Sequence, residues 1–285
     1  MDEPVIKKHP TEVFGYAFTE KSEKSKDALS RQYCHFIKAE CNKPRKSEPH
    51  IKVGICSVGY KGSVQKVFRP VIICPNRFIE SHVFETIQRL YLQDWGKNLQ
   101  WIHEVTMGVG GNIDVVAAKM SEDKTKIVDF LCVEFQAAGT TGTPWQAVLD
   151  LKKTGKFSSD SYDFGINWAN EFMKTMMQQV YKKSKIVQHW KRKILFVVQD
   201  VALDYLHDAV DTSAIREAHP DDEIHFITFK MTWTGNAWAL QFAKAFSTNV
   251  EGINKILGGA HTDKYLTTED FKKNIYDKGK RDGVF

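Results

Sequence analysis

The sequence lacks the features that mark membrane, secreted and fibrous proteins. Its apolar runs are all shorter than the roughly 20 residues that a membrane-spanning helix needs. The first thirty residues are rich in charge and contain no apolar segment of the kind found in a secretory signal. The 8 prolines and 18 glycines form no repeat. We therefore expect a globular protein of the cytoplasm, without a membrane partner, in which thiols stay reduced.

Motifs of several enzyme classes are also missing. The sequence has no G-x-x-x-x-G-K-[ST] stretch, which excludes a P-loop nucleotidase, and no serine lies in a nucleophile elbow. The glycines within residues 108–111 follow a strand pattern but precede no helix, which argues against a dinucleotide site. We expect no nucleotide cofactor. The net charge of +5 permits a polyanionic partner but does not require one.

The hydrophobic pattern predicts a mixture of strands and helices. Strands are expected at residues 53–58, 67–74, 101–106, 112–118, 127–136, 194–199, 223–233 and 240–247. Helices are expected at residues 78–95, 144–153, 166–189, 203–209 and 248–257. Short turns separate the three strands between residues 101 and 136, which is typical of an antiparallel meander. The order of these elements predicts an α/β fold, preceded by a small module rich in cysteine.

The long helix expected at residues 166–189 has one apolar stripe. This stripe comprises Ala169, Phe172, Met173, Met176 and Val180. The polar residues that lie off the stripe are Lys174, Gln178, Lys182 and Lys183. The segment 181–193 at the end of this helix holds six basic residues. They either follow a DNA backbone or form the solvated end of the helix.

Two acidic residues lie in strands that are otherwise apolar. Asp114 is near the start of the strand at 112–118, and Glu134 and Gln136 end the strand at 127–136. Glu134 and Gln136 are two positions apart, so they share one face of a strand at a spacing of roughly 7 Å. If the two strands are neighbours, Asp114 approaches Glu134 and an oxygen-rich site forms, of the kind that Mg²⁺ prefers. The same spacing also fits two satisfied polar residues near strand ends.

A divalent ion at such a site suits phosphodiester hydrolysis. It would neutralise a phosphate oxygen, lower the pKa of bound water and stabilise the leaving oxygen. Gln136 cannot act as a base, but it can orient water or coordinate through its carbonyl oxygen.

Four of the five cysteines form a second pattern. Cys34, Cys41, Cys56 and Cys74 are separated by six, fourteen and seventeen residues. Four thiolates so close together in a cytosolic protein suggest a tetrahedral site for Zn or Fe, although the usual C-x-x-C pair is missing. The alternative is a set of buried free thiols. Cys132 shares the face of Glu134 and is expected to be an inert thiol.

A series of short segments, in chain order, carries a family resemblance. They are EVFG at 12–15, CHF at 34–36, the later Cys41, GICSV at 54–58, CPNR at 74–77, the strand pair with Asp114, VEFQ at 133–136 and the helix segment 166–181. In these segments the chain resembles the NotI-like type II restriction endonucleases. The four cysteines match that family's Cys₄ iron module. VEFQ matches its E-x-Q form of the PD-(D/E)xK nuclease motif, in which Gln replaces the usual Lys.

The resemblance implies a fold and a set of site residues. The fold would be a PD-(D/E)xK nuclease core at residues 78–285, a central mixed sheet flanked by helices, with an N-terminal Cys₄ subdomain at residues 1–77. Asp114, Glu134 and Gln136 would form the nuclease triad, with Asp114 and Glu134 holding Mg²⁺. Glu104 lies where the family has a carboxylate, and it is either an outer partner of the metal or a solvated glutamate. The four cysteines would hold structural Fe or Zn.

The implied function is that of a type II restriction endonuclease. It would hydrolyse double-stranded DNA at specific sequences with Mg²⁺, leaving 5′-phosphate ends. Because a duplex has two antiparallel strands, one site per subunit implies a homodimer that reads a palindrome. The alternatives are a repair or structure-specific nuclease of the same fold and a non-enzymatic metal-module protein that binds DNA. Residues that could read base edges are Asn42, Arg77, Gln146 and Asn170.

Overall fold

A seven-stranded mixed sheet forms the centre of the computed structural model, which describes residues 2–45, 47–62, 67–168, 176–258 and 267–283. The strands are β7 (Leu99–Thr106), β8 (Asn112–Met120), β9 (Ile127–Gln136), β12 (Ile194–Gln199), β13 (Arg216–Glu217), β14 (Ile224–Trp233) and β15 (Trp238–Thr248). Their order across the sheet is β13-β15-β14-β12-β9-β8-β7. The meander β7-β8-β9 is antiparallel, β9, β12 and β14 run parallel, and β14, β15 and β13 are antiparallel. The expected meander and the mixed α/β sheet are confirmed.

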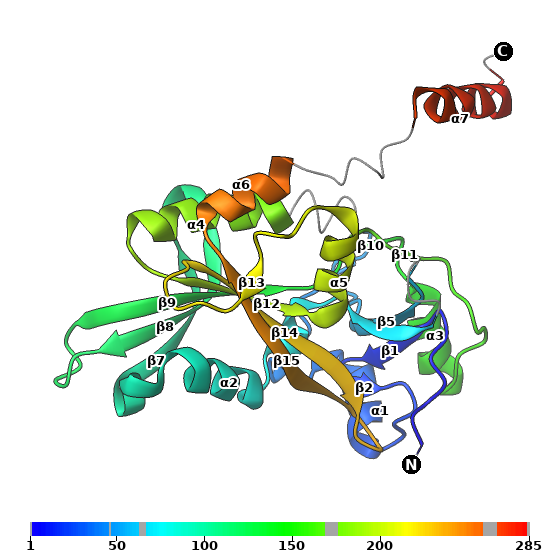
Figure 1. Cartoon of the computed structure of the whole chain (residues 1–285). Coiled ribbons are helices and arrows are strands. Elements are labelled where there is room, and N and C mark those ends of the chain that lie inside the picture. Colours follow the sequence, from blue (N-terminus) through cyan, green and yellow to red (C-terminus); the bar gives the residue numbers. More distant parts are fainter. Residues whose placement is uncertain (1, 46, 63–66, 169–175, 259–266, 284–285) are drawn as a thin grey trace.

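Helices cover both faces of this sheet (Figure 1). One face carries α4 (Met177–His189), α5 (Asp200–Ala209) and α6 (Val250–Gly258), and the other carries η1 (Pro75–Phe78) and α2 (Ser81–Tyr91). Side chains of β12 alternate between the two cores, with Phe196 beneath α4 and Val197 beneath α2. A strand covered on both faces is apolar throughout, which explains the continuous run ILFVV. In β9 the same alternation puts Cys132 in the core beneath α4 and Val133 in the core beneath α2.

The N-terminal part has its own sheet and hydrophobic core. The strands β1 (Pro10–Val13), β2 (Tyr16–Ala17), β5 (Ile55–Tyr60) and β6 (Arg69–Ile72) are antiparallel in the order β2-β1-β5-β6. The helix α1 (Glu23–Arg31) and the hairpin of β3 (Tyr33–Cys34) and β4 (Ala39–Glu40) join them. The pair β10 (Thr140–Thr141) and β11 (Gly165–Ile166) and the helix α3 (Trp145–Thr154) contribute to the same core. Residues 1–77 thus share a core with residues 138–166, and a domain boundary at residue 77 stays a prediction.

Arg77 connects the N-terminal part to the central sheet. Its side chain is fully buried, and its Nε donates to both carboxylate oxygens of Glu12 at 3.0 and 2.9 Å. The same guanidinium contacts Glu80 and donates to the backbone oxygen of Trp238 in β15 at 2.8 Å. A buried arginine needs such partners, because an unpaired buried charge is strongly unfavourable. Arg77 was predicted as a possible reader of base edges, and this prediction is wrong because no part of its side chain reaches the surface.

Most expected elements are present, and their bounds differ for local reasons. The strand expected at 67–74 is the shorter β6, and the helix expected at 78–95 is divided into η1, α2 and η2 (Gln93–Asn98). Within the segment expected as a helix at 166–189, β11 ends at Ile166 and α4 extends from Met177 to His189. The part of the predicted stripe formed by Ala169, Phe172 and Met173, together with Lys174, lies outside the described residues.

The C-terminal segment contains a helix that the sequence analysis did not predict. This helix, α7 (Thr268–Arg281), begins after Thr267, whose hydroxyl accepts a hydrogen bond from the N–H of Asp270 at 3.1 Å. A Thr-x-x-Asp sequence is a capping signal, so the start of α7 was readable. Among the described residues, no helix is both long and apolar enough to cross a bilayer.

Candidate active site

The side chains of Asp114 and Glu134 meet between two adjacent strands. In the antiparallel pair β8-β9, Val115 is the partner of Val133, so the next position places Asp114 opposite Glu134 on the same face. The N–H of Phe135 donates to Asp114 Oδ2 at 2.8 Å, and the N–H of Asp114 donates to Glu134 Oε1 at 3.3 Å. Two carboxylates that are 20 positions apart in sequence are therefore neighbours in space.

Each of these carboxylates has one oxygen held by the protein and one oxygen left for a ligand. Asp114 Oδ2 and Glu134 Oε1 accept the hydrogen bonds described above. Asp114 Oδ1 and Glu134 Oε2 accept none from the residues that the structure describes. Oriented oxygens of this kind are suitable ligands for a hard divalent cation.

Burial raises the pKa of both carboxyl groups, and the charge of a neighbouring carboxylate raises each pKa further. Glu134 is 2% exposed, and its pKa is raised to about 7, first by burial and second by the charge of Asp114. The pKa of Asp114 is also raised by burial, against the opposing effects of the Phe135 N–H and of the charges of Lys183 and Lys43. A bound cation would offset the desolvation cost of the two carboxylates and reduce the repulsion between them.

Glu104 lies across from Asp114 on the other neighbouring strand. The residues that flank it in β7 pair in register with β8, which places Glu104 opposite Asp114. Its side chain is exposed, and its charge adds to the raised pKa of Asp114. Its φ of 54° is unusual for a residue other than glycine within a strand. Strained backbone gathers at functional sites, which supports a role for Glu104 beside the carboxylate pair.

Gln136 ends β9 on the same face as Glu134. It is half-buried, and its strand partner in β12 is Val198. Its side chain makes no hydrogen bond with the described residues. An amide in this place can accept and donate hydrogen bonds but adds no charge to the two carboxylates.

Lys183 is the residue of this site that the sequence analysis missed. It was placed off the apolar stripe, yet the residue is only 5% exposed. Its Nζ lies 2.7 Å from Glu134 Oε1 and donates to the backbone oxygen of Asn112 at 2.7 Å. Val180 and Val187 are fully buried on the same helix. The positions 180, 183 and 187 have the spacing of one helix face, and this spacing was the signal available in the sequence.

The four predicted metal-ligating cysteines gather in the N-terminal part. Cys34, Cys41, Cys56 and Cys74 are all buried free thiols. The pKa of Cys74 is raised to about 12, first by burial, and the charges of Cys41 and Cys34 add to this shift. Burial likewise raises the pKa of Cys56, with further contributions from Cys74 and Cys34. The four sulfurs are therefore close enough to interact electrostatically.

Backbone donors near these sulfurs fit thiolate ligands. The N–H groups of Lys43 and Gly54 are hydrogen-bonded to Cys41, and the N–H of Asn76 is hydrogen-bonded to Cys74. These bonds favour the thiolate, which is the form that binds a metal. Within the described ranges, however, no group of three or more His, Cys, Asp or Glu side chains is arranged so that it could hold a metal ion. The Cys₄ centre thus stays a prediction.

Lys43 connects the thiol cluster to the carboxylate pair electrostatically. Its positive charge lowers the pKa of Cys41 and Cys74, and it also lowers the pKa of Asp114. The N-terminal part therefore lies beside the candidate active site. The fifth cysteine, Cys132, is buried with a pKa raised to about 12, as fits an inert thiol.

The side chains that the sequence suggested for DNA contact differ in burial and in their hydrogen-bond and ion-pair partners. Asn42 accepts a hydrogen bond from Asn76 at 2.8 Å, and Gln146 donates to Asp150 at 2.9 Å. Asn170 lies outside the described residues. In the basic segment 181–193, Lys183 is buried and Arg192 pairs with Asp129 at 2.9 Å. This segment is therefore not a uniform row of solvated cations.

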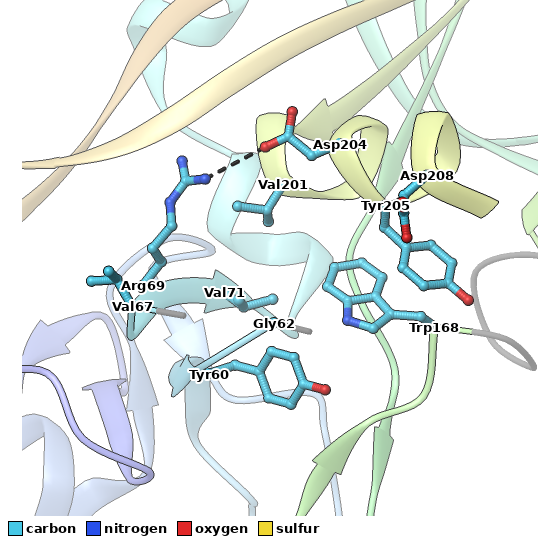
Figure 2. A pocket seen from close by; sticks show the side chains of 10 residues that line it. All are labelled: Tyr60, Gly62, Val67, Arg69, Val71, Trp168, Val201, Asp204, Tyr205 and Asp208. Carbon is cyan, nitrogen blue, oxygen red and sulfur yellow. Dashed lines mark hydrogen bonds and ion pairs between the residues drawn. The ribbon is translucent and has the colours of Figure 1, made fainter. Parts of the chain in front are cut away.

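A separate pocket of about 120 Å³ lies between the N-terminal part and α5 (Figure 2). Trp168 stacks on Tyr205 with ring centroids 5.1 Å apart, and Arg69 pairs with Asp204 at 3.5 Å. Tyr60 adds a third ring to the lining. None of the residues of the carboxylate site lines this pocket. We therefore take the strand pair β8-β9 at Asp114 and Glu134, and not this aromatic pocket, as the candidate active site.

Comparison with known proteins assigns the family. No curated protein matches the chain. The family model described as "Restriction endonuclease NotI" matches residues 12–240. That range includes the carboxylate pair, Lys183 and all four clustered cysteines, and it covers well over half of the 285 residues. The chain belongs to the NotI restriction endonuclease family.

Proposed function

We propose that this chain is a Mg²⁺-dependent type II restriction endonuclease with a PD-(D/E)xK core. The supporting topology is the helix α2, the meander β7-β8-β9, the helix α4 and the parallel strand β12, taken in chain order. The observation that carries the proposal is the pairing of Asp114 with Glu134, each with one oxygen directed by hydrogen bonds and one oxygen left for a ligand. Family membership supplies the substrate, double-stranded DNA.

Asp114 and Glu134 would hold the ion through Oδ1 and Oε2. When bound, Mg²⁺ supplies charge neutralisation at the scissile phosphate and activation of water. Gln136, two positions beyond Glu134 on the same face, orients the attacking water through its amide. Glu104, on β7 opposite Asp114, would be an outer partner of the ion. The products would be a 5′-phosphate and a 3′-hydroxyl.

The test is the substitution Glu134→Ala. It should abolish cleavage of plasmid DNA with Mg²⁺ and leave duplex binding intact, because Glu134 would hold the ion and is too deeply buried to contact a DNA groove. Asp129→Ala on the same strand is the matched control, since Asp129 pairs with Arg192 far from the carboxylate pair. Mg²⁺-dependent cutting by a folded Glu134→Ala variant would refute the assignment.

The pattern of cleavage distinguishes a restriction enzyme from a repair nuclease. A restriction enzyme cuts unmodified plasmid at discrete recurring sites, whereas a structure-specific nuclease cuts at lesions or junctions. Sequencing of the fragment ends would give the recognition site and show whether each end carries a 5′-phosphate. Random cleavage positions would refute the sequence-specific proposal.

We also propose a homodimer and a structural Fe or Zn at the four cysteines. With one proposed carboxylate site per chain, cutting both strands of a duplex in a single binding event takes two copies. Light scattering of the purified protein with and without its duplex would report the dimer. A monomer in both states would contradict it.

A further inference from the structure

The candidate active site contains a buried cation whose role the function proposed above does not explain. Lys183 belongs to α4, the helix that covers the sheet face on which Asp114 and Glu134 lie. Its ammonium is almost completely buried and is 2.7 Å from Glu134 Oε1. A buried lysine is strongly unfavourable unless it is paired and hydrogen-bonded. Burying this ammonium beside Glu134 costs the protein the free energy of its hydration.

We propose that Lys183 is the positioning residue for Glu134 as an ion ligand. This inference rests on the proposed metal-dependent function. Lys183 and the N–H of Asp114 both hold Oε1, which fixes the carboxylate plane and leaves Oε2 as the ligand oxygen. The second bond of Lys183, to the backbone oxygen of Asn112, fixes the ammonium in turn.

The bond to Asn112 ties Lys183 to the strand that carries Asp114. Asn112 begins β8, two positions before Asp114, whereas Glu134 lies on β9. The ammonium thus bridges the two strands at the point where the two carboxylates meet. Any change in the separation of β8 and β9 at this end would stretch one of its two 2.7 Å contacts. Lys183 therefore sets the geometry of the pair in addition to the orientation of Glu134.

The charge balance of the site gives Lys183 a second effect. Glu134 is buried and Asp114 is half-buried, Glu104 adds a third negative charge nearby, and Gln136 is uncharged. Among the described residues around these carboxylates, Lys183 is the cation that contacts one of them directly, at Glu134. Without it, the two carboxylates repel each other across adjacent strands and relieve the repulsion by rotating apart.

The experiment measures ion binding without DNA, so that turnover plays no part. Mn²⁺ is titrated into the full-length dialysed protein, and free Mn²⁺ is followed by electron paramagnetic resonance. Loss of a partner that orients a metal ligand typically lowers metal affinity by roughly 10- to 100-fold, and we expect a loss of this size for Lys183→Met. Lys182→Met is the matched control, because Lys182 is the preceding residue of the same helix and is exposed. Its Mn²⁺ affinity should equal that of the unmodified protein.

Two further variants make every outcome informative. Asp114→Asn tests the proposed function: if it leaves Mn²⁺ binding unchanged, the carboxylate site is wrong and the role of Lys183 falls with it. If Asp114→Asn abolishes binding but folded Lys183→Met binds Mn²⁺ as tightly as the unmodified protein, or more tightly, the positioning role alone is overturned. If Lys183→Met does not fold, Lys183→Arg replaces it, because it keeps the charge but not the contact geometry. Unchanged affinity in folded Lys183→Arg would then overturn the proposal, and an affinity reduced severalfold would support it.

Discussion

Replacing the Glu134 carboxyl group by an amide should change how the stability of the ion-free protein depends on pH. The pKa of Glu134 is raised from 4.5 to about 7 in the folded protein, mainly by burial. Between these two pH values the folded state holds a proton that the unfolded state has released. The free energy of unfolding therefore decreases as pH rises through this window, and the loss is complete above about pH 7.

The size of the effect follows from the difference between the two pKa values. A change from 4.5 to about 7 in a group that is 2% exposed corresponds to about 3 kcal/mol. Glu134→Gln has no proton to release, so this contribution disappears. Below about pH 7 the folded unmodified protein holds Glu134 protonated, so the substitution removes no charge beside Lys183 in that range. The diagnostic quantity is therefore the difference in slope and not the difference in stability at one pH.

Urea unfolding at a series of pH values, without added divalent ion, measures both curves. From pH 4.5 to pH 8 the unmodified protein should lose about 3 kcal/mol more than Glu134→Gln. Glu122→Gln is the control, because Glu122 is exposed in the turn between β8 and β9. Added Mg²⁺ should restore stability to the unmodified protein above pH 7 and not to Glu134→Gln. Parallel curves for the unmodified protein and Glu134→Gln would refute the burial argument.

Three other predictions concern the N-terminal part. Arg77→Met should lower the free energy of unfolding by about 3–5 kcal/mol, because it leaves Glu12 as an unpaired buried charge; a loss below 1 kcal/mol in urea unfolding would contradict this. Gly54→Ala should destabilise by about 2 kcal/mol or more, because φ is +68° and a Cβ would lie 2.3 Å from the ring of Phe14. Its control is Gly62→Ala, where a Cβ meets nothing within 4 Å, and equal thermal shifts for the two variants would oppose the reasoning. Elemental analysis should find one Fe or Zn per chain and a stoichiometric loss in Cys34→Ser, whereas an unmodified protein without either metal would refute the Cys₄ centre.

The sequence determined the elements and the chemistry that they carry. Apolar periodicity is a local property, so β7, β8, β9 and β12 were readable from residue spacing alone. The acidic residues Asp114 and Glu134 were conspicuous because they interrupt apolar strands. The short segments from residue 12 to residue 181 indicated the family, which the match over residues 12–240 confirmed.

Only the tertiary structure decided how these side chains meet. The register of β8 against β9 depends on packing across the whole sheet, and a shift by one residue would put Asp114 and Glu134 on opposite faces. Arg77 and Lys183 resemble surface cations in the sequence, yet both are buried because distant carboxylates, Glu12 and Glu134, compensate their charges. A buried charge depends on a partner that is remote along the chain, so the helical spacing of positions 180, 183 and 187 could suggest that Lys183 is buried but could not identify Glu134 as its partner.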